Sequence, residues 1–375
     1  MIYFDNAATT GKKPLSVVRA VNNALLNYSA NPGRSGHKAA ELAADAVYRV
    51  RCSVADFFGA DGPEQVIFTL NCTHSINCVL KGVIGKTDHI IVSNLEHNAV
   101  MRPLTKIGVN YDIAEVSLVS DSITVENFSR LIKPNTKMIF CTGGSNVIGK
   151  LLPLKELGAL CRQRGILFGV DAAQTAGVIP IDMKKMNIDF LCIAPHKGLY
   201  APMGVGILIA RQQIDNTLIE GGTGTGSAEL VQGVIMPEDF ESGTVNLPGI
   251  LGVGAGIEFL KLRGVKNIYS HEMDLSEKIY NSFIKNKKIL MYAPKPEINK
   301  YAPVISFNVE GKKCYEVSEY LNKKGIAVRA GLHCAPIAHR SIGTLNLGTV
   351  RVCPSAFTQA NEINYFINAV HGIKS

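Results

Sequence analysis

Between residues 60 and 210, short and fully apolar runs alternate with longer stretches in which apolar residues recur at helical spacing. In one such stretch, apolar residues recur from 154 to 161, and Gly165 is placed to end that helix. The apolar runs are rich in Val, Ile and Phe, which is typical of buried strands, and they cover residues 66–69, 89–93, 137–142, 166–171, 190–194 and 205–210. This alternation predicts a mostly parallel sheet covered on both faces, with ligands bound beyond the carboxyl ends of its strands.

The pattern changes after about residue 250. Residues 250–262 predict a long helix that leads into a more basic helical segment. Three further strands are predicted at 304–309, 326–329 and 349–352, with a helix at 315–323. We therefore expect a large domain over residues 16–255 and a smaller α+β domain made of residues 1–15 and 256–375.

Composition is ordinary for a globular enzyme, because 46% of the 375 residues are apolar and 19% are charged. No apolar run approaches the roughly 18 residues of a membrane span, so we expect no membrane insertion. The first six residues include an acid and lack a basic-then-apolar run, which argues against a signal peptide. The expected location is the cytoplasm.

The net charge of +8 comes from scattered Lys and Arg residues. Nucleic-acid binding would favour a basic stripe with interleaved aromatics, which the sequence lacks, so no nucleic-acid partner is expected. The nine cysteines form no Cys-x-x-Cys pair, which predicts buried thiols and room for one reactive thiol rather than disulfides. Cys334 and His339 have no further ligands nearby, and no metal site is expected.

Two strand ends carry the first candidate chemistry. Asp171 ends the run 166–171, where a buried acid is costly unless it is paired with a positive charge such as a protonated pyridine nitrogen. His196 and Lys197 follow the run 190–194, and burial lowers the pKa of a Lys so that it can bond to a carbonyl group. Each is commonplace alone, but together they fit a pyridoxal phosphate site.

A phosphate site is predicted where the apolar run 66–69 leads into a helix. Thr73 can cap this helix, and the exposed amides at its N-terminus suit a phosphate dianion. An ordinary helix cap with nothing bound is the alternative, and the residues alone leave both open.

Several motifs in order resemble those of the class V aminotransferase family: Asp-Asn-Ala-Ala-Thr at 5–9, Glu-His at 96–97, Asp-Ala-Ala-Gln at 171–174 and His-Lys at 196–197. Arg-x-Gly-x-His-Cys-Ala at 329–335 and Gly-Thr-Val-Arg at 348–351 are similar to the cysteine desulfurase branch, in particular its SufS-like group II with a short catalytic loop. The resemblance implies the type I fold of pyridoxal-phosphate transferases, an α/β fold with a mostly parallel seven-stranded sheet in the large domain and a smaller α+β domain.

The resemblance also implies roles for single residues. Lys197 would bind the aldehyde of pyridoxal 5'-phosphate and later carry the substrate's α-proton, and Cys334 would receive the sulfur. Asp171 would pair with the ring nitrogen, Gln174 with the ring hydroxyl, and His97 would stack on the ring as a third catalytic residue. Further cofactor contacts are implied for Thr73, the His74 amide, Asn146, His196 and, from the partner subunit, Thr244.

Arg351 would bind the substrate carboxylate through its planar fork, near Asn146. From the residues alone, a surface Arg on the strand 349–352 is the alternative. Cys334 lies in a glycine-containing segment before Pro336, which predicts an accessible loop, although a free Cys is more often a small buried hydrophobe. Nearby positive charge would lower the thiol pKa from about 8.5.

Two positions depart from the family pattern. Ala194 stands where the family has Ser or Thr before the His-Lys pair, which removes one phosphate hydrogen bond. Cys353 stands where the family often has Ser, and we expect it to be a buried strand residue.

The function implied by the resemblance is that of a cysteine desulfurase, a sulfurtransferase that converts L-cysteine to L-alanine and leaves a persulfide on Cys334. The sulfur would pass to an acceptor protein or small molecule, and the enzyme would be a homodimer. The alternatives are a selenocysteine lyase, another C–S lyase or aminotransferase of class V, and a non-catalytic sulfur-carrier module.

Overall fold

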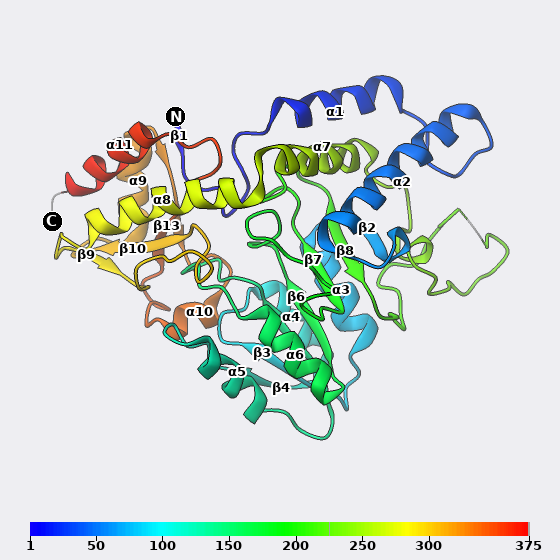
Figure 1. The fold of residues 1–375 in the computed structure, drawn as a ribbon, viewed down its shortest axis with the longest axis horizontal. Helices are drawn as coiled ribbons and strands as arrows, with labels where there is room; N and C mark the ends of the chain where they lie inside the picture. Colours follow the sequence, from blue (N-terminus) through cyan, green and yellow to red (C-terminus); the bar gives the residue numbers. More distant parts are fainter. Residues whose placement is uncertain (225, 374–375) are drawn as a thin grey trace.

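The computed structural model describes residues 1–224 and 226–373, which form a large α/β domain with a smaller α+β domain beside it (Figure 1). The large sheet has seven strands in the order β2-β8-β7-β6-β5-β3-β4. Only β8 runs against its neighbours, and the other pairs are parallel. The strands are β2 (Val66–Thr69), β3 (His89–Ser93), β4 (Asn110–Ala114), β5 (Thr136–Thr142), β6 (Leu167–Asp171), β7 (Phe190–Ile193) and β8 (Gly206–Ala210).

This sheet confirms the predicted mostly parallel seven-stranded architecture. The hydrophobic pattern located six of its strands and missed β4. That strand lies at the sheet edge, and Asn110, Tyr111 and Ile113 are exposed. A strand that is only partly buried carries no continuous apolar run, so its pattern is weak.

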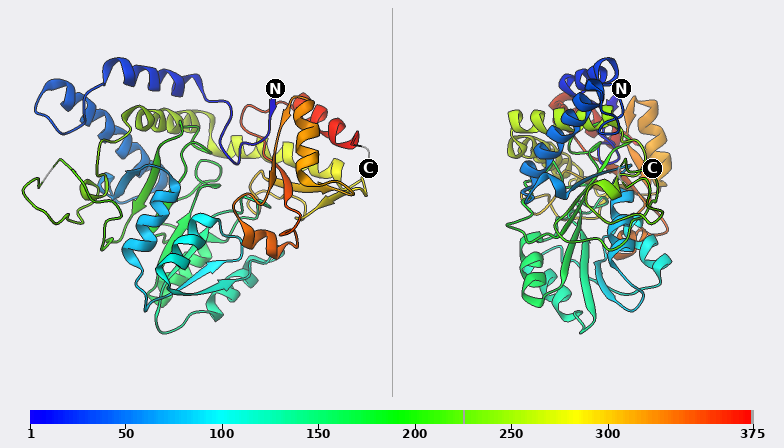
Figure 2. Two further views of the ribbon diagram at one scale, coloured as in Figure 1. Left: turned by 180° about the vertical axis from the view of Figure 1, so that it is seen from behind. Right: turned by 90° about the vertical axis from the view of Figure 1, so that its right-hand side faces the viewer.

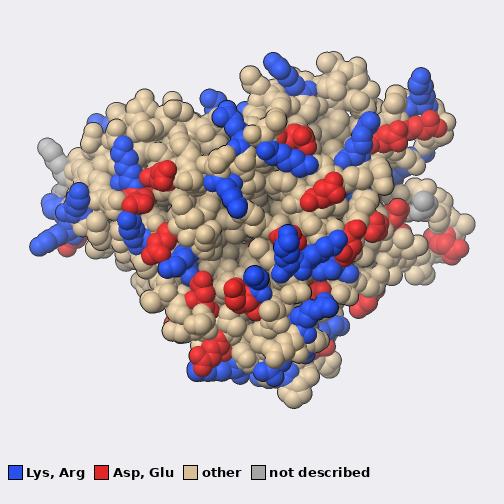
Figure 3. All heavy atoms as spheres, in the orientation of Figure 1, with Lys and Arg blue, Asp and Glu red and all other residues tan. Residues whose placement is uncertain are grey.

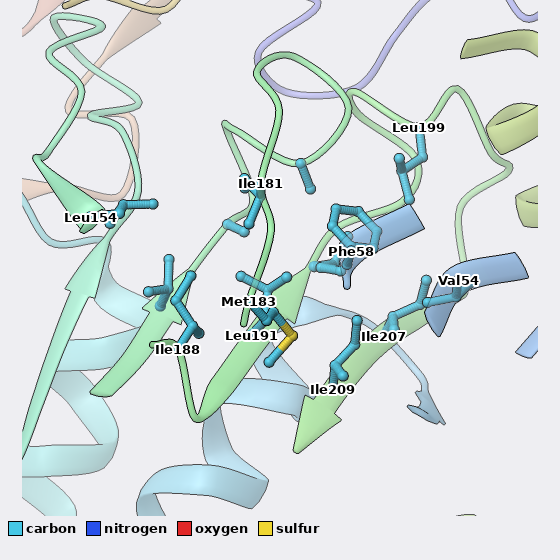
Figure 4. Close-up of a cluster of buried hydrophobic side chains, with 14 of the residues drawn as sticks. Val54, Phe58, Leu154, Ile181, Met183, Ile188, Leu191, Leu199, Ile207 and Ile209 are labelled. Atoms are coloured by element: carbon cyan, nitrogen blue, oxygen red, sulfur yellow. The ribbon is translucent and has the colours of Figure 1, made fainter. Parts of the chain in front are cut away.

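Helices cover both faces of the sheet (Figure 2, right). Successive residues of a strand point to opposite faces, so Phe140 belongs to one apolar layer and Cys141 to the other. The first layer includes α3 (Cys72–Val83) and α4 (Asn98–Ile107), and the second includes α2 (Lys38–Phe58), α5 (Asp121–Arg130), α6 (Leu154–Arg164) and α7 (Leu247–Arg263). Figure 4 shows part of the second layer, where Phe58 and Met183 lie beside Leu191 and Ile207. Outside these layers, α1 (Leu15–Asn27) packs on α7.

The small domain is built on an antiparallel sheet in the order β12-β13-β10-β9. Its strands are β9 (Ile289–Met291), β10 (Ile305–Val309), β12 (Arg329–Gly331) and β13 (Thr349–Val352). Its helices are α8 (Val265–Phe283), α9 (Cys314–Lys323), α10 (Pro336–Ser341) and α11 (Ala360–His371), and short 3-10 helices lie at Pro63–Gln65 and Glu238–Phe240 in the large domain.

The N-terminal segment lies against the small domain, because β1 (Ile2–Tyr3) pairs in parallel with β11 (Ile326–Ala327). The predicted boundary at 255/256 falls inside α7, where Val253 and Ile257 belong to the same buried cluster. The domain boundaries therefore stay a prediction.

Charged side chains of both signs are interspersed over the face of the molecule in Figure 3. Among residues 1–224 and 226–373, none of the helices combines the length and the apolar character that crossing a bilayer requires.

Two glycines of α7 give a test of how tightly this helix packs. A Cβ at Gly256 would overlap the backbone oxygen of Leu199, whereas a Cβ at Gly254 would lie 2.9 Å from Cγ2 of Val50, a side chain that can move. Because backbone cannot give way, we expect Gly256→Ala to destabilise the protein by about 1–3 kcal/mol. Gly254→Ala should stay within about 1 kcal/mol of the parent, helped by the helix propensity of Ala. Urea unfolding measures both, and equal stabilities would contradict the packing.

Candidate active site

The carboxyl ends of β5, β6 and β7 meet at one edge of the sheet, beside a cavity of about 120 Å³. Parallel strands bring residues that are far apart in sequence to this edge. The residues of the predicted site that line the cavity are Thr73, His97, Asn146, Asp171, Gln174, His196 and Lys197.

Four of the predicted site residues do not line this cavity. His74 and Thr244 line a different cavity of about 140 Å³, where Asn31 donates a hydrogen bond to Thr244 Oγ1 over 3.4 Å. Cys334 and Arg351 belong to the small domain and reach the site through the contacts described below.

Asp171 is buried and 4% exposed at the end of β6. Its Oδ1 accepts a hydrogen bond from the Ala173 amide over 2.9 Å, and the Cys72 thiol lies 3.6 Å away. Asp171 forms no ion pair within the part of the chain that the structure describes. A buried carboxylate without a cation is costly, and this one faces a cavity that could hold its partner.

Lys197 lines the same cavity as Asp171. Burial lowers the pKa of its amine, and Arg351 and Arg329 add to this effect, while Asp171 opposes it. A larger fraction of neutral amine makes this lysine able to bond to a carbonyl group near neutral pH.

The N-terminal segment holds the peptide that precedes Lys197. The carbonyl oxygen of His196 accepts hydrogen bonds from Thr9 Oγ1 and Thr10 Oγ1, each over 3.1 Å, and from Lys13 Nζ over 2.8 Å. Burial lowers the pKa of Lys13 to about 8. The sequence motif at 5–9 indicated the family but gave no reason to place these donors here.

Both histidines of the cavity have a lowered pKa, which favours their neutral form. His97 caps α4, since its Nδ1 accepts from the Ala99 amide over 3.0 Å, and burial lowers its pKa. The pKa of His196 is lowered to about 4 by burial, helped by Lys197 and Lys13. Its Nδ1 is buried and has no hydrogen-bond partner, so a bound group could supply one.

The predicted helix cap was wrong. Asn71, not Thr73, caps α3: its Oδ1 accepts from the His74 amide over 2.9 Å. The extended backbone of Asn71 places it before the helix, which moves Thr73 into the first turn. The His74 amide is therefore already bonded within the chain, and its contact with a phosphate stays a prediction.

Cys334 is exposed and lies in the segment between β12 and α10. Its carbonyl oxygen accepts from the amide of Asn98, the neighbour of His97, over 2.8 Å, and the His333 carbonyl accepts from Asn146 Nδ2 over 2.7 Å. These bonds hold the cysteine segment against the large domain at the cavity.

The backbone of this segment is strained. His333 (φ 50°) and Cys334 (φ 58°) both adopt the left-handed conformation, which costs a non-glycine residue on the order of 1–3 kcal/mol. Arg329 Nη2 lies 4.0 Å from Cys334 Sγ. Such strain persists only where the surroundings fix it, here through the Asn98 and Asn146 contacts.

Arg351 is 1% exposed, which excludes the alternative of a surface arginine. It lies directly opposite Arg329 across β12 and β13. Its Nη2 pairs with Asp5 Oδ1 and its Nη1 donates to the Asn146 carbonyl, both over 3.0 Å. Its Nε is buried without a hydrogen-bond partner among the described residues, so one N–H of the guanidinium is left that an anion could accept from. Nothing in the sequence pattern indicated the Asp5 contact.

Glu96 is a second residue whose place sequence reasoning missed, although it was part of a motif. It is fully buried and accepts hydrogen bonds from Ser93 Oγ and, over 2.9 Å, from the Thr142 amide. Burial raises its pKa to about 8. Cys353 is buried as expected, and burial raises the pKa of its thiol.

The comparisons with known proteins agree with one another. The family model for class V aminotransferases matches residues 2–366. A probable cysteine desulfurase of Pyrococcus abyssi is 31% identical over 383 residues, which cover 99% of this chain and 93% of the relative.

Two solved structures are also similar over almost the whole chain. The apo structure of a cysteine desulfurase from Thermococcus onnurineus has a TM-score of 0.90 at 32% identity and covers 99% of this chain and 95% of its own. The cysteine desulfurase CsdA of Escherichia coli, in an S-sulfonic acid form, has a TM-score of 0.84 at 25% identity, with 98% and 93% covered.

The burial of the cysteines predicts which of them reacts in the folded protein. Cys334 is exposed, Cys52 is half-buried and the other seven are buried, and burial raises the pKa of Cys78, for example, to about 12. We expect iodoacetamide at neutral pH to alkylate Cys334 first and the buried seven only after unfolding. Peptide mass spectrometry over a time course measures this, and Cys334→Ser should remove the fast phase. Early labelling of Cys141 or Cys192 would contradict it.

Proposed function

The chain belongs to the class V aminotransferase family, and on that basis we propose that it is a cysteine desulfurase in which Lys197 and Cys334 act on one substrate. It converts L-cysteine to L-alanine with pyridoxal 5'-phosphate as cofactor. The observation that carries this proposal is the hydrogen bond from the Asn98 amide to the Cys334 carbonyl, which holds the backbone of the exposed cysteine beside His97, a residue that lines the Lys197 cavity.

The residues of the cavity fit the cofactor. Asp171 supplies a buried carboxylate that forms no ion pair with any described residue and could pair with a protonated ring nitrogen. His196 Nδ1 is a buried polar atom with no hydrogen-bond partner among the same residues. Lys197 supplies an amine of lowered pKa. When bound, the cofactor supplies an electron sink that stabilises negative charge at the substrate α-carbon.

The roles of the chain's own residues follow from their positions. Arg351 binds the substrate carboxylate through its unpaired Nε edge, while Asp5 and the Asn146 carbonyl fix the other side of the guanidinium. Lys197 takes the proton from the substrate α-carbon and returns it, because its lowered pKa allows both protonation states.

Cys334 then takes the sulfur. Its thiolate attacks the substrate sulfur, so that an S–S bond forms and the carbon–sulfur bond breaks. The electron pair of the broken bond goes to the substrate carbon, which takes up a proton and leaves as L-alanine. Arg329 Nη2 lies 4.0 Å from Cys334 Sγ, close enough for its positive charge to stabilise the anionic sulfur of the persulfide.

Several further features belong to this proposal. The persulfide passes to an acceptor protein or small molecule, the chain belongs to the SufS-like group II, and it works in the cytoplasm. It acts as a homodimer in which Thr244 contacts the phosphate bound by the partner subunit. The same residues would serve a selenocysteine lyase, and the ratio of rates with the two amino acids distinguishes these activities.

Two substitutions test the separate roles of the Lys197 amine and the Cys334 thiol. Lys197→Ala should abolish the normal visible absorbance of the bound cofactor, since the covalent anchor is lost. Cys334→Ser should keep that absorbance and end persulfide formation, with alanine production reduced at least about 100-fold. Alanine assay and mass spectrometry of the Cys334 peptide measure both. Sulfide release at the parent rate from Cys334→Ser would refute the role of the thiol.

The carboxylate role of Arg351 is tested by Arg351→Lys, which keeps the charge and loses the planar fork. Losing one charged hydrogen bond costs about 1.5–3 kcal/mol, so we expect KM for L-cysteine to rise about 10- to 100-fold. Arg340→Lys, on the exposed side of α10, is the matched control and should leave KM unchanged. An unaltered KM in Arg351→Lys would exclude the contact.

A further inference from the structure

A second, smaller cavity of about 30 Å³ lies behind Lys197. Ala173, Gln174 and Lys197 line both this cavity and the larger one, so the two cavities adjoin at these residues. Tyr200, Glu272 and Cys353 line the small cavity as well. The cavity has room for one or two water molecules, since about 10–15 Å³ suffices for one, and Lys197, Tyr200 and Glu272 bring polar groups to its wall.

Glu272 is a buried acid without a cation. It is 5% exposed on α8, among apolar residues such as Ile268 and Ile279 that face the protein interior. Its Oε1 accepts a hydrogen bond from the Tyr200 hydroxyl over 3.3 Å, and it forms no ion pair in the described ranges 1–224 and 226–373. Burial raises its pKa to about 8, so Glu272 carries a proton at neutral pH.

Tyr200 connects this acid to the turn that follows Lys197. Its amide donates to the Lys197 carbonyl over 3.0 Å, and its φ of 55° is in the left-handed region. A bulky residue in that conformation costs on the order of 1–3 kcal/mol. The Ala356 amide donates to the Tyr200 hydroxyl over 3.1 Å, and the ring packs against Phe259 and Phe357. The strained turn thus fixes the hydroxyl on Glu272.

We propose that Glu272 is the proton store of Lys197, and that water in the small cavity carries the proton between them. The inference rests on the proposed role of Lys197 in proton transfer. In the forward direction, the Glu272 carboxyl gives a proton to water and the same water gives one to the Lys197 amine, leaving a carboxylate and an ammonium. The reverse transfer restores both neutral groups, so protons and charge balance.

The position of Glu272 explains why Lys197 would exchange its proton with this residue. Lys197 is half-buried and lines the cavity assigned to the cofactor, so a bound cofactor and substrate would cover its amine from bulk water on that side. A carboxylate formed at Glu272 would also stabilise the ammonium of Lys197, because opposite charges attract strongly away from water. Glu272 therefore acts through Lys197, by supplying and taking back its proton, and does not touch the substrate.

Other titratable groups lie near Glu272 and near Lys197. Those near Glu272 are Tyr200 after β7, Cys353 after β13 and Tyr269 on its own helix. Those near Lys197 come from α3, β6, β12 and β13 and are Cys72, Asp171, Arg329 and Arg351, with His97 and His196 beside them. Asp171 and Glu272 are the carboxylic acids among these groups, and Asp171 is assigned to the ring nitrogen.

Difference infrared spectroscopy tests the coupling without any turnover. In the protein freed of cofactor, we expect a protonated carboxyl band that disappears with a midpoint near pH 8 and is absent in Glu272→Gln. Because a neighbouring ammonium favours the carboxylate, Lys197→Ala should move this midpoint upward. Tyr269→Phe is the matched control on the same helix, since its hydroxyl bonds the Tyr301 carbonyl and does not line the cavity; it should leave the midpoint in place.

The holoenzyme supplies a second readout. Glu272→Gln should lower kcat about 10-fold, below the 10²–10⁴-fold that direct acid–base groups supply. It should also remove the limb of the kcat profile near pH 8 and keep KM for L-cysteine within about two-fold. If this variant fails to fold, Tyr200→Phe carries the test: loss of the hydroxyl donor should raise the Glu272 midpoint, because that hydrogen bond lowers its pKa.

The outcomes separate the two proposals. An unchanged Glu272 midpoint in Lys197→Ala, or a parental pH profile in Glu272→Gln, overturns the proton store and leaves the desulfurase proposal standing. Absence of alanine from the parent enzyme would instead remove the desulfurase role, while the infrared coupling could still be measured.

Discussion

The structure depends on keeping the Lys197 amine out of water at the end of β7. Its lowered pKa comes from burial, and burial at this point requires that the peptide before it be held firmly. The N-terminal segment supplies that hold by directing three side-chain donors to the His196 carbonyl. Because β1 of the same segment pairs with β11, the backbone of the lysine is tied to the small domain as well as to the large sheet.

Asn146 links the two other parts of the site. Its side chain donates to the His333 carbonyl, next to Cys334, and its own carbonyl accepts from Arg351. One residue of the large domain therefore positions both the segment that carries the thiol and the arginine assigned to the carboxylate. Hydrogen bonds that meet in one residue fix relative position better than separate contacts, because an error in one would strain the other. This arrangement explains how a strained, exposed cysteine can keep a defined place.

The predictions that failed did so for local physical reasons. The β4 strand was missed because an edge strand is not buried on both faces. Thr73 is predicted as the helix cap, but Asn71, which is equally suited, lies two residues earlier and caps the helix. Arg351 could not be distinguished from a surface residue, since an alternating strand looks the same whether its polar face meets water or another domain. Glu272 lies among the buried apolar residues of α8. An acid at an apolar position of a helix is visible in the sequence and could have indicated a buried carboxyl group.

The sequence by itself determined six of the seven strands of the large sheet, the acid and lysine at successive strand ends, and the motifs that indicate the family. These are local properties, because side-chain chemistry and hydrophobic spacing act over a few residues. Only the tertiary structure shows that, among the described residues, the Asp171 and Glu272 carboxyl groups form no ion pair and that Arg351 Nε and His196 Nδ1 have no hydrogen-bond partner. Whether a polar group is paired depends on every segment that packs around it, and segments hundreds of residues apart, such as Asp5 and Arg351, settle it.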